Sequence, residues 1–362
     1  MSGLLYNSPA SVWEEALPLG NGRMGAMVYG GAVNEHIQLN EESIWYGGKM
    51  DRDNPDTLRN LPKIRQLLLD GEISKAERLM RLTMSGCPES AHPYQTLGDL
   101  YIDFNIEGDI YNYERRLDLE KAAADVSFSC AGVNYRRTVF ASHPADCIVM
   151  CIESDRPGTI NLEARFSRPE RAYNGVDRIG KDTIVLHGDL GKHGYDFAVS
   201  LKAVADGGSI EQLGEYLVVT GADRVVLYIA ADCTYHCKDE LEHIMAEKLK
   251  TLKESEAAGD LNRQNGNNGS YAVMESEAAL WLLKGRMQKV LDRAAGESYN
   301  QLLDAHISDY RRLFARVDFS LGGDEDNCDA VKDSASGSAA YTTDELLKSA
   351  KEGSVKVKKL SL

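Results

Sequence analysis

The sequence lacks any run of about 18 apolar residues, the length that spans a bilayer, and no apolar secretory segment follows Met1. It is also poor in positive charge, with 41 Lys and Arg against 56 Asp and Glu and a formal net charge of −15. Such a chain repels phosphate backbones and anionic membrane surfaces. We therefore expect a cytoplasmic protein that binds neither nucleic acid nor membrane. A secreted protein without its signal segment would have the same composition.

Cysteine is sparse, with seven residues at spacings that do not fit a secreted disulfide framework. Two pairs are four residues apart, Cys147 with Cys151 and Cys233 with Cys237, and His236 lies beside the second. On a strand, the Cα atoms of such a pair are about 13 Å apart, which is too far for one zinc ion. We predict buried small side chains here, with no metal site and no cofactor.

The sequence also lacks the G-x-S-x-G motif of serine hydrolases. A cysteine nucleophile is conceivable, because Cys87 in "SGCPES" is near His92 in sequence, but an ordinary loop cysteine explains the pattern equally well. Carboxylates are too frequent for sequence alone to select a catalytic pair. No catalytic residue is therefore assigned.

The stretch "GNGRMG", residues 20–25, matches the dinucleotide-binding pattern G-x-G-x-x-G, with Glu41 and Glu42 about 20 residues further on. That pattern needs a buried strand before it and a helix after it. The preceding residues contain Pro18 and no apolar run, and the alternation at 36–39 follows a Gly-Gly turn signal. We predict a strand, a glycine turn and a strand, with glycines that allow close backbone approach or positive φ.

Hydrophobic periodicity divides the chain into β-rich and helical parts. Residues 58–84 have helical spacing interrupted at Gly71, which predicts two short helices. From residue 98 to about 235 the period is two, with Gly, Asn, Asp or Pro between the runs. Many strands without intervening helices predict a mainly β fold, a large antiparallel β-sandwich.

Helical spacing returns after the strands, over 239–257, 274–295 and 299–317. The polar stretch "NRQNGNNGS", residues 262–270, predicts a loop or a disordered segment. In "TTDELLKSA" we expect a further helix with Thr343 as its cap.

The segment "LNEESIWYGG", residues 39–48, places Asn40, Glu41 and Glu42 close to Trp45 and Tyr46. Aromatic faces stack on sugar rings, and nearby polar groups can bind their hydroxyls. In the alternative interpretation, Trp45 belongs to the core and the acids face solvent.

Several of these segments resemble glycoside hydrolase family 95, the α-L-fucosidase and α-L-galactosidase family. The resemblance starts in "VWEEALPLGNGRMGAMVYGGAVNEHIQLNEESIWYGGKMDRDNP". It continues in the family's order through "LPKIRQLLLDGEISKAERL", "YQTLGDLYIDF", "YERRLDLEKAAADVSF", "YRRTVFASHPADCIVM" and "LLDAHISDYRRLFARVDFSLG". It covers the chain from about Leu5 to Gly322.

The resemblance implies a β-sandwich, a helical linker and then an (α/α)₆ barrel. For this chain it implies a sandwich at 1–238, a short α-helical linker at 239–322 and a flexible tail at 323–362. The tail would end where the barrel should begin, and its segment 323–340 should be cut first by proteases. The family's catalytic residues lie in the barrel, so none is expected here.

The resemblance also suggests residues that face the barrel or the rim of the substrate site: Asn21, Arg23, Asn40, Glu41 and Trp45. The alternative is that the glycines near Arg23 only form a turn and that Arg23 makes a structural ion pair.

The function expected from the resemblance is that of a non-catalytic N-terminal domain of a fucosidase-like hydrolase, inactive alone. The alternatives are a stand-alone carbohydrate-binding module and a hydrolase with an unrecognised site. Expected partners are a catalytic barrel fragment or full-length partner, a fucosylated or L-galactosylated glycan, and a second copy of the chain. Homodimerisation would use apolar side chains that lack their barrel cover, namely Leu302, Leu303, Leu313, Phe314, Trp45 and Trp281.

Overall fold

The computed structural model describes residues 3–48, 50–169, 172–191, 194–257, 267–317 and 342–351. Its contacts divide the chain into two compact units. The larger comprises Met1–Ser43, Thr96–Gly188 and Asp196–Leu362, and the smaller comprises Ile44–Gln95 and Asp189–Tyr195. None of the helices within the described ranges combines the length and the hydropathy that a membrane crossing requires.

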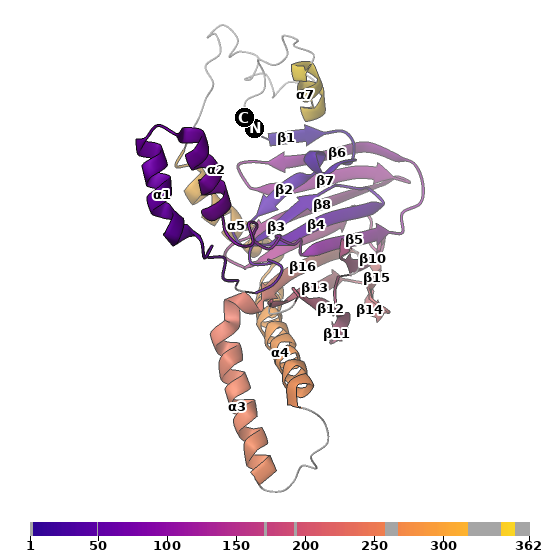
Figure 1. The fold of residues 1–362 in the computed structure, drawn as a ribbon. Helices are drawn as coiled ribbons and strands as arrows, with labels where there is room; N and C mark the ends of the chain where they lie inside the picture. The colour runs from indigo at the N-terminus through magenta and orange to yellow at the C-terminus, as the bar shows by residue number, and fades with distance from the viewer. Residues whose placement is uncertain are drawn as a thin grey trace. The chain divides into compact units, whose positions relative to one another are not determined.

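The larger unit contains two antiparallel sheets, so the predicted β-sandwich is confirmed (Figure 1). The nine-stranded sheet has the order β1 (Gly3–Tyr6), β6 (Ile110–Asp118), β7 (Ala123–Cys130), β8 (Val133–Ser142), β9 (Cys147–Ser154), β16 (Arg224–Cys233), β13 (Asp196–Asp206), β12 (Thr183–Asp189) and β11 (Gly175–Ile179). The seven-stranded sheet has the order β14 (Ser209–Leu213), β15 (Tyr216–Ala222), β10 (Ile160–Ser167), β5 (Gly98–Phe104), β4 (Asn34–Glu41), β3 (Met24–Val28) and β2 (Leu17–Gly20).

The two sheets pack face to face. Strands β2 and β3 contact β8, β10 contacts β9, and β14 and β15 contact β13. On β10, Leu162, Ala164 and Phe166 are buried while the intervening residues are only partly buried, as expected for a strand with one face in the core. Each large apolar side chain placed there contributes about 1.5–3 kcal/mol to the stability of the sandwich.

Helices cover the other face of the nine-stranded sheet. Helix α4 (Asn267–Ala295) lies on β9, β13 and β16, α5 (Tyr299–Phe314) contacts β8, and α3 (Lys238–Ala257) packs on α4 (Figure 1). Strands β9 and β16 are therefore buried on both faces, which explains their nearly continuous apolar sequences. These three helices thus form a third layer of this unit.

Two details of the helical prediction are wrong. The loop predicted over 262–270 is wrong for 267–270, because α4 already begins at Asn267. Residues 262–266 lie outside the described residues. A helix anchored by its buried apolar face can extend over a turn whose own residues have weak helical propensity. At the other end, the helix predicted over 299–317 stops at Phe314.

The exposed apolar surface is smaller than predicted. Leu302 is 2% exposed, so the prediction that it depends on an external cover is wrong, whereas Leu303 is partly buried against the same cluster as the α4 side chains. The reason is that α5 itself docks on the sheet. In contrast, Leu313, Phe314 and Trp281 are exposed.

Helix α7 (Thr343–Lys351) confirms the helix predicted late in the chain. The helix begins at Thr343, so Thr342 and not Thr343 occupies the cap position. The Thr342 N–H donates to Glu345 Oε2 (2.9 Å), and Thr343 Oγ1 accepts the N–H of Leu5 in β1 (2.9 Å). The segment 323–340 lies outside the described residues, and the predicted domain boundaries stay predictions.

The smaller unit contains the two predicted short helices, α1 (Thr57–Leu69) and α2 (Ile73–Thr83). Gly71 separates them with φ of +74°, a conformation that favours glycine. Only part of their apolar surface is used within the unit: Ile64 and Ala76 are buried, whereas Leu58 is 82% exposed.

Candidate functional site

The "GNGRMG" stretch forms the hairpin between β2 and β3 at the edge of the seven-stranded sheet. Gly22 has φ of +95° at the turn. Asn21 Oδ1 accepts the backbone N–H groups of Arg23 (3.1 Å) and Met24 (2.7 Å), while its Nδ2 donates to the carbonyl of Ser142 (3.2 Å). The predicted strand, turn and strand are confirmed, and Asn21 shapes the turn.

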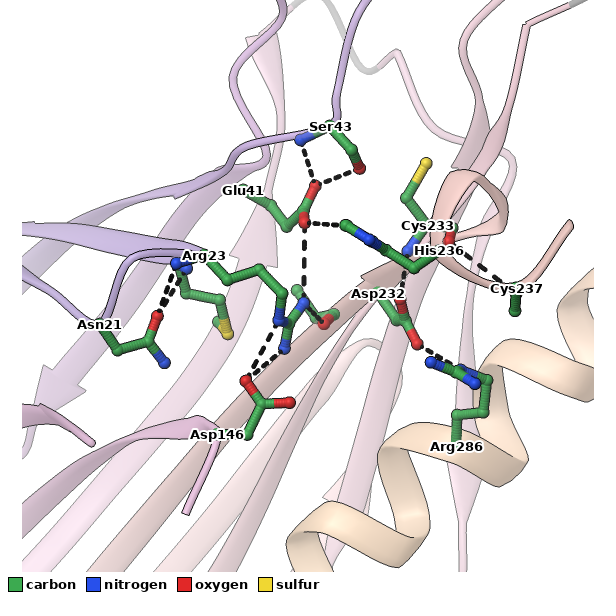
Figure 2. A network of polar contacts seen from close by, with 12 residues as sticks. Asn21, Arg23, Glu41, Ser43, Asp146, Asp232, Cys233, His236, Cys237 and Arg286 are labelled. Carbon is green, nitrogen blue, oxygen red and sulfur yellow. Dashed lines mark hydrogen bonds and ion pairs between the residues drawn. The ribbon is translucent and has the colours of Figure 1, made fainter. Parts of the chain in front are cut away.

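Arg23 leaves this turn and joins both sheets (Figure 2). Its Nε and Nη2 donate to Asp146 Oδ1 at 3.1 and 3.0 Å, and its Nη1 donates to the carbonyl of Ala231 in β16 at 2.6 Å. Nη1 also lies 3.6 Å from Glu41 Oε1. The side chain is 21% exposed, so the guanidinium is partly desolvated and still reachable from solvent.

Glu41, the last residue of β4, has a fully buried side chain. Its Oε2 accepts the N–H (2.8 Å) and the hydroxyl (2.6 Å) of Ser43, and its Oε1 is 2.9 Å from His236 Nε2 (Figure 2). A buried carboxylate requires hydrogen bonds and a nearby positive charge to offset its lost hydration. In the sequence His236 stands out only as a neighbour of two cysteines, and nothing local signals its contact with Glu41, 195 residues away.

A second polar cluster lies nearby, where β16 leads into the helices (Figure 2). Asp232 Oδ2 accepts from Arg286 Nε of α4 (2.7 Å), and Asp232 Oδ1 accepts the N–H of Cys233 (2.9 Å). Arg286 Nη1 also donates to Glu240 Oε1 of α3 (3.1 Å). Arg286 therefore ties two helices to the end of β16.

A pocket of about 260 Å³ lies between these two clusters. This is slightly below the range of about 300–1,000 Å³ typical of small-molecule sites. Charged side chains of both signs dominate its lining, which comprises Arg23, Asp146, Ala230, Ala231, Asp232, Glu240, Arg286, Met287, Lys289 and Val290. Its chemistry suits a small polar ligand or a polar side chain of a partner.

The residues predicted for a barrel-facing rim do not all come together. Arg23 and Glu41 meet, and Asn21 supports them, but Asn40 is exposed on the opposite face of β4 because successive side chains alternate. Trp45 belongs to the smaller unit. The alternative that placed Trp45 in the core is wrong, since Trp45 is 49% exposed. Of the two acids that this alternative placed in solvent, Glu42 is exposed and Glu41 is buried.

The cysteine pairs are buried, as predicted. Burial raises the pKa of Cys151 and Cys233 to about 11 and that of Cys147 and Cys237 to about 12. These groups are therefore neutral thiols at physiological pH and are poor nucleophiles and metal ligands. Cys87 is exposed.

Sequence comparisons identify relatives among sugar-processing enzymes. The chain is 28% identical to Alpha-L-fucosidase 2 of Arabidopsis thaliana over 90% of its own length and 37% of the relative. It is 26% identical to Probable alpha-fucosidase A of Aspergillus niger over 84% of this chain and 36% of that one. A shorter match, 24% identical, covers 44% of the chain and 21% of Kojibiose phosphorylase of Thermoanaerobacter brockii.

The chain thus spans little more than a third of the two fucosidase sequences. The family model described as glycosyl hydrolase family 65, N-terminal domain, matches residues 4–238, which include both sheets and the Arg23 hairpin. The chain therefore belongs to the family of glycosyl hydrolase family 65 N-terminal domains.

Proposed function

We propose that the chain acts as the non-catalytic N-terminal part of a fucosidase-like enzyme of glycoside hydrolase family 95. The observation that carries this proposal is the alignment of 90% of the chain with only 37% of Alpha-L-fucosidase 2. The match to a kojibiose phosphorylase adds support, because a domain shared by enzymes named for different reactions is poorly suited to determine the reaction.

The carboxylates of the pocket also favour a non-catalytic role. Glycoside hydrolysis needs one protonated carboxyl and one free carboxylate on either side of the sugar. Here Asp146 is bound by Arg23, while Asp232 and Glu240 are both bound by Arg286. In each of these carboxylates a guanidinium already occupies one oxygen that a substrate would have to reach.

Glu35, which lies outside the pocket, is a carboxyl that retains its proton more readily because it is buried. Burial raises the pKa of Glu35, against the opposing charge of Arg137. The side chains of this pair are 0% and 2% exposed, so Glu35 is not accessible to a glycan.

We further propose that the surface around Arg23 faces a catalytic domain. The pocket is built jointly by the β2–β3 hairpin, β16 and the helices α3 and α4, and its charged groups are only partly exposed. Such a surface offers polar groups in fixed positions to a complementary partner.

The test is turnover of chromogenic α-L-fucosides and α-L-galactosides by the purified chain. We expect no release above a heat-inactivated sample. Turnover that is lost in Asp146→Asn or Asp232→Asn would overturn the non-catalytic assignment and place the chemistry in the pocket.

A second candidate function, carbohydrate binding, has one specific observation in its favour. In the smaller unit Trp45 and Tyr94 pair through an isolated antiparallel bridge, and their rings meet edge to face with centroids 5.1 Å apart. Both remain exposed, at 49% and 37%, and an exposed aromatic face can stack on a sugar ring.

Calorimetric titration with fucosylated and L-galactosylated oligosaccharides tests this candidate. Trp45→Ala should abolish binding, whereas Trp13→Ala, which removes a 54% exposed tryptophan of the larger unit, should not. Equal effects of both substitutions, or no binding by the unsubstituted chain, would reject it.

The association with a barrel or with a second copy remains a proposal. The exposed Leu313 and Phe314 on α5 are the residues we expect to mediate it. Sedimentation in high salt, which screens the net charge of −15, should show a dimer that Phe314→Lys weakens. A monomer at high micromolar concentration would exclude self-association.

A further inference from the structure

Three groups with metal-binding atoms converge at the end of β4. One ligand atom from each of Glu41, Glu42 and His236 lies within 4.8 Å of the other two. Glu41 is buried, His236 is partly buried and Glu42 is exposed. The histidine is 195 residues away from Glu41 in sequence, so the cluster exists only in the folded chain.

The three ligand atoms lie within 4.8 Å of one another, close to the spacing that one small cation requires. Two atoms bound to a cation at about 2.0–2.2 Å lie at most about 4.4 Å apart. Glu41 Oε1 and His236 Nε2, at 2.9 Å, already meet this limit. Because Glu42 is exposed, it can reach the same point by changing its rotamer.

The charges around the cluster favour a cation. Arg23 Nη1 forms an ion pair with Glu41 Oε1 at 3.6 Å, but the hydrogen bonds of Arg23 are directed to Asp146 and the carbonyl of Ala231, so a bound cation would share with Arg23 the neutralisation of Glu41. The cluster and the adjacent pocket contain more carboxylates than cationic side chains, namely Glu41, Glu42, Asp146, Asp232 and Glu240 against Arg23, Arg286 and Lys289.

We propose that Glu41, Glu42 and His236 form a binding site for a first-row divalent cation. One imidazole with two carboxylates is a ligand set that suits Zn²⁺ and accepts Mn²⁺. On binding, the Nε2 lone pair of a neutral His236 coordinates the ion and its proton resides on Nδ1. The hydrogen bond between His236 and Glu41 is then replaced by two bonds to the cation, and water completes the coordination.

The consequence would be structural. Glu41 and Glu42 end β4 of the seven-stranded sheet, whereas His236 lies in the short 3₁₀ helix η3 (Thr234–Cys237) between β16 and α3. A shared cation would therefore connect one sheet to the start of the helical layer. This site is independent of the proposed function, since it requires no sugar and no catalytic partner.

The test is titration of the chelator-treated full chain with Mn²⁺, followed by electron paramagnetic resonance, because Mn²⁺ binds thiols weakly. We expect one Mn²⁺ per chain, displaced by Zn²⁺ in equal amount. Glu42→Gln and His236→Ala should each weaken binding by at least about tenfold, as loss of even an outer-shell partner commonly does. Mn²⁺ should raise the melting temperature of the unsubstituted chain but not of Glu42→Gln.

The chain provides a matched control in His243 and Glu247, an exposed pair on α3 with 3.5 Å between Nε2 and Oε1. His243→Ala should leave Mn²⁺ binding unchanged. Because Glu42 is exposed, Glu42→Gln should keep the circular dichroism spectrum of the unsubstituted chain, so a loss of binding would not reflect unfolding. Absence of binding at millimolar Mn²⁺, or binding that persists in both Glu42→Gln and His236→Ala, would overturn the proposal.

Discussion

Replacing Arg137 by methionine removes the counter-charge of a fully buried carboxylate. Arg137 Nη1 is 3.2 Å from Glu35 Oε2, and the two side chains are 2% and 0% exposed. Arg137 also donates to the carbonyl of Gly31 (2.6 Å) and lies over the rings of Phe104 and Phe128. Glu35 Oε1 additionally accepts the backbone N–H of Gly30 (2.7 Å). A methionine fits the aromatic surroundings but leaves the carboxylate unpaired.

The expected cost follows from that unpaired charge. Breaking a buried ion pair by removing one partner costs about 3–5 kcal/mol of unfolding free energy. For a domain of this size that loss corresponds to a decrease in melting temperature of about 6–20 °C. The double variant Glu35→Gln with Arg137→Met should recover most of the loss, because a neutral amide oxygen can still accept the N–H of Gly30.

The loss should also depend on pH. Burial raises the folded-state pKa of Glu35, and removal of Arg137 takes away the strongest influence that lowers it. A carboxyl whose pKa is raised on folding destabilises the fold fully when the pH is above its folded-state pKa. The effect disappears when the pH is below its unfolded-state pKa of about 4.3. The difference between Arg137→Met and the unsubstituted chain should therefore shrink as pH falls from 8 towards 5.

Calorimetric melting temperatures measured across this pH range provide the assay. Arg136 is the control, since it neighbours Arg137 on β8 but is 62% exposed and pairs with Asp125 at the surface. Arg136→Met should cost no more than about 1 kcal/mol at any pH. If Arg137→Met costs no more than Arg136→Met, or if its cost grows towards low pH, the account of the buried pair is wrong.

Three further predictions concern the hairpin, helix α5 and the thiols. Gly22→Ala should cost about 1–2 kcal/mol because of its positive φ, whereas Gly20→Ala should cost little, and urea unfolding would distinguish them. Burial lowers the pKa of His306, whose Nε2–H donates to the carbonyl of Lys121 (2.9 Å). Neutral His306 contributes its full stability above about pH 6.5, and this contribution is lost as the pH falls. Hydrogen exchange in α5, corrected for intrinsic rates, should therefore be faster at pH 5 than at neutral pH. In His306→Gln this acceleration should be smaller. In a Cys328→Ser chain, a maleimide should rapidly label Cys87 alone. Fast labelling of a second thiol in the folded chain would contradict the burial of the other cysteines, namely Cys130, Cys147, Cys151, Cys233 and Cys237.

Local sequence patterns were sufficient to predict the fold class. The period of two predicted most of the strands that follow residue 98 in the two sheets, and the interruption at Gly71 predicted the two helices of the smaller unit. The residues before "GNGRMG" were enough to reject a dinucleotide site in favour of a hairpin. These predictions succeed because periodicity and turn chemistry act over a few neighbouring residues.

The sequence did not determine which side chains meet. Glu41 and His236 are 195 residues apart, and Arg23 reaches a carbonyl 208 residues away. Such contacts depend on how strands pair and sheets stack, which is decided by burial summed over the whole core. For the same reason the sequence suggested Asn40 as a companion of Glu41, although adjacent residues of a strand point to opposite faces. The sequence by itself therefore determined most strands and most helices of this protein, whereas only the tertiary structure decided that Arg23, Glu41 and His236 share one site.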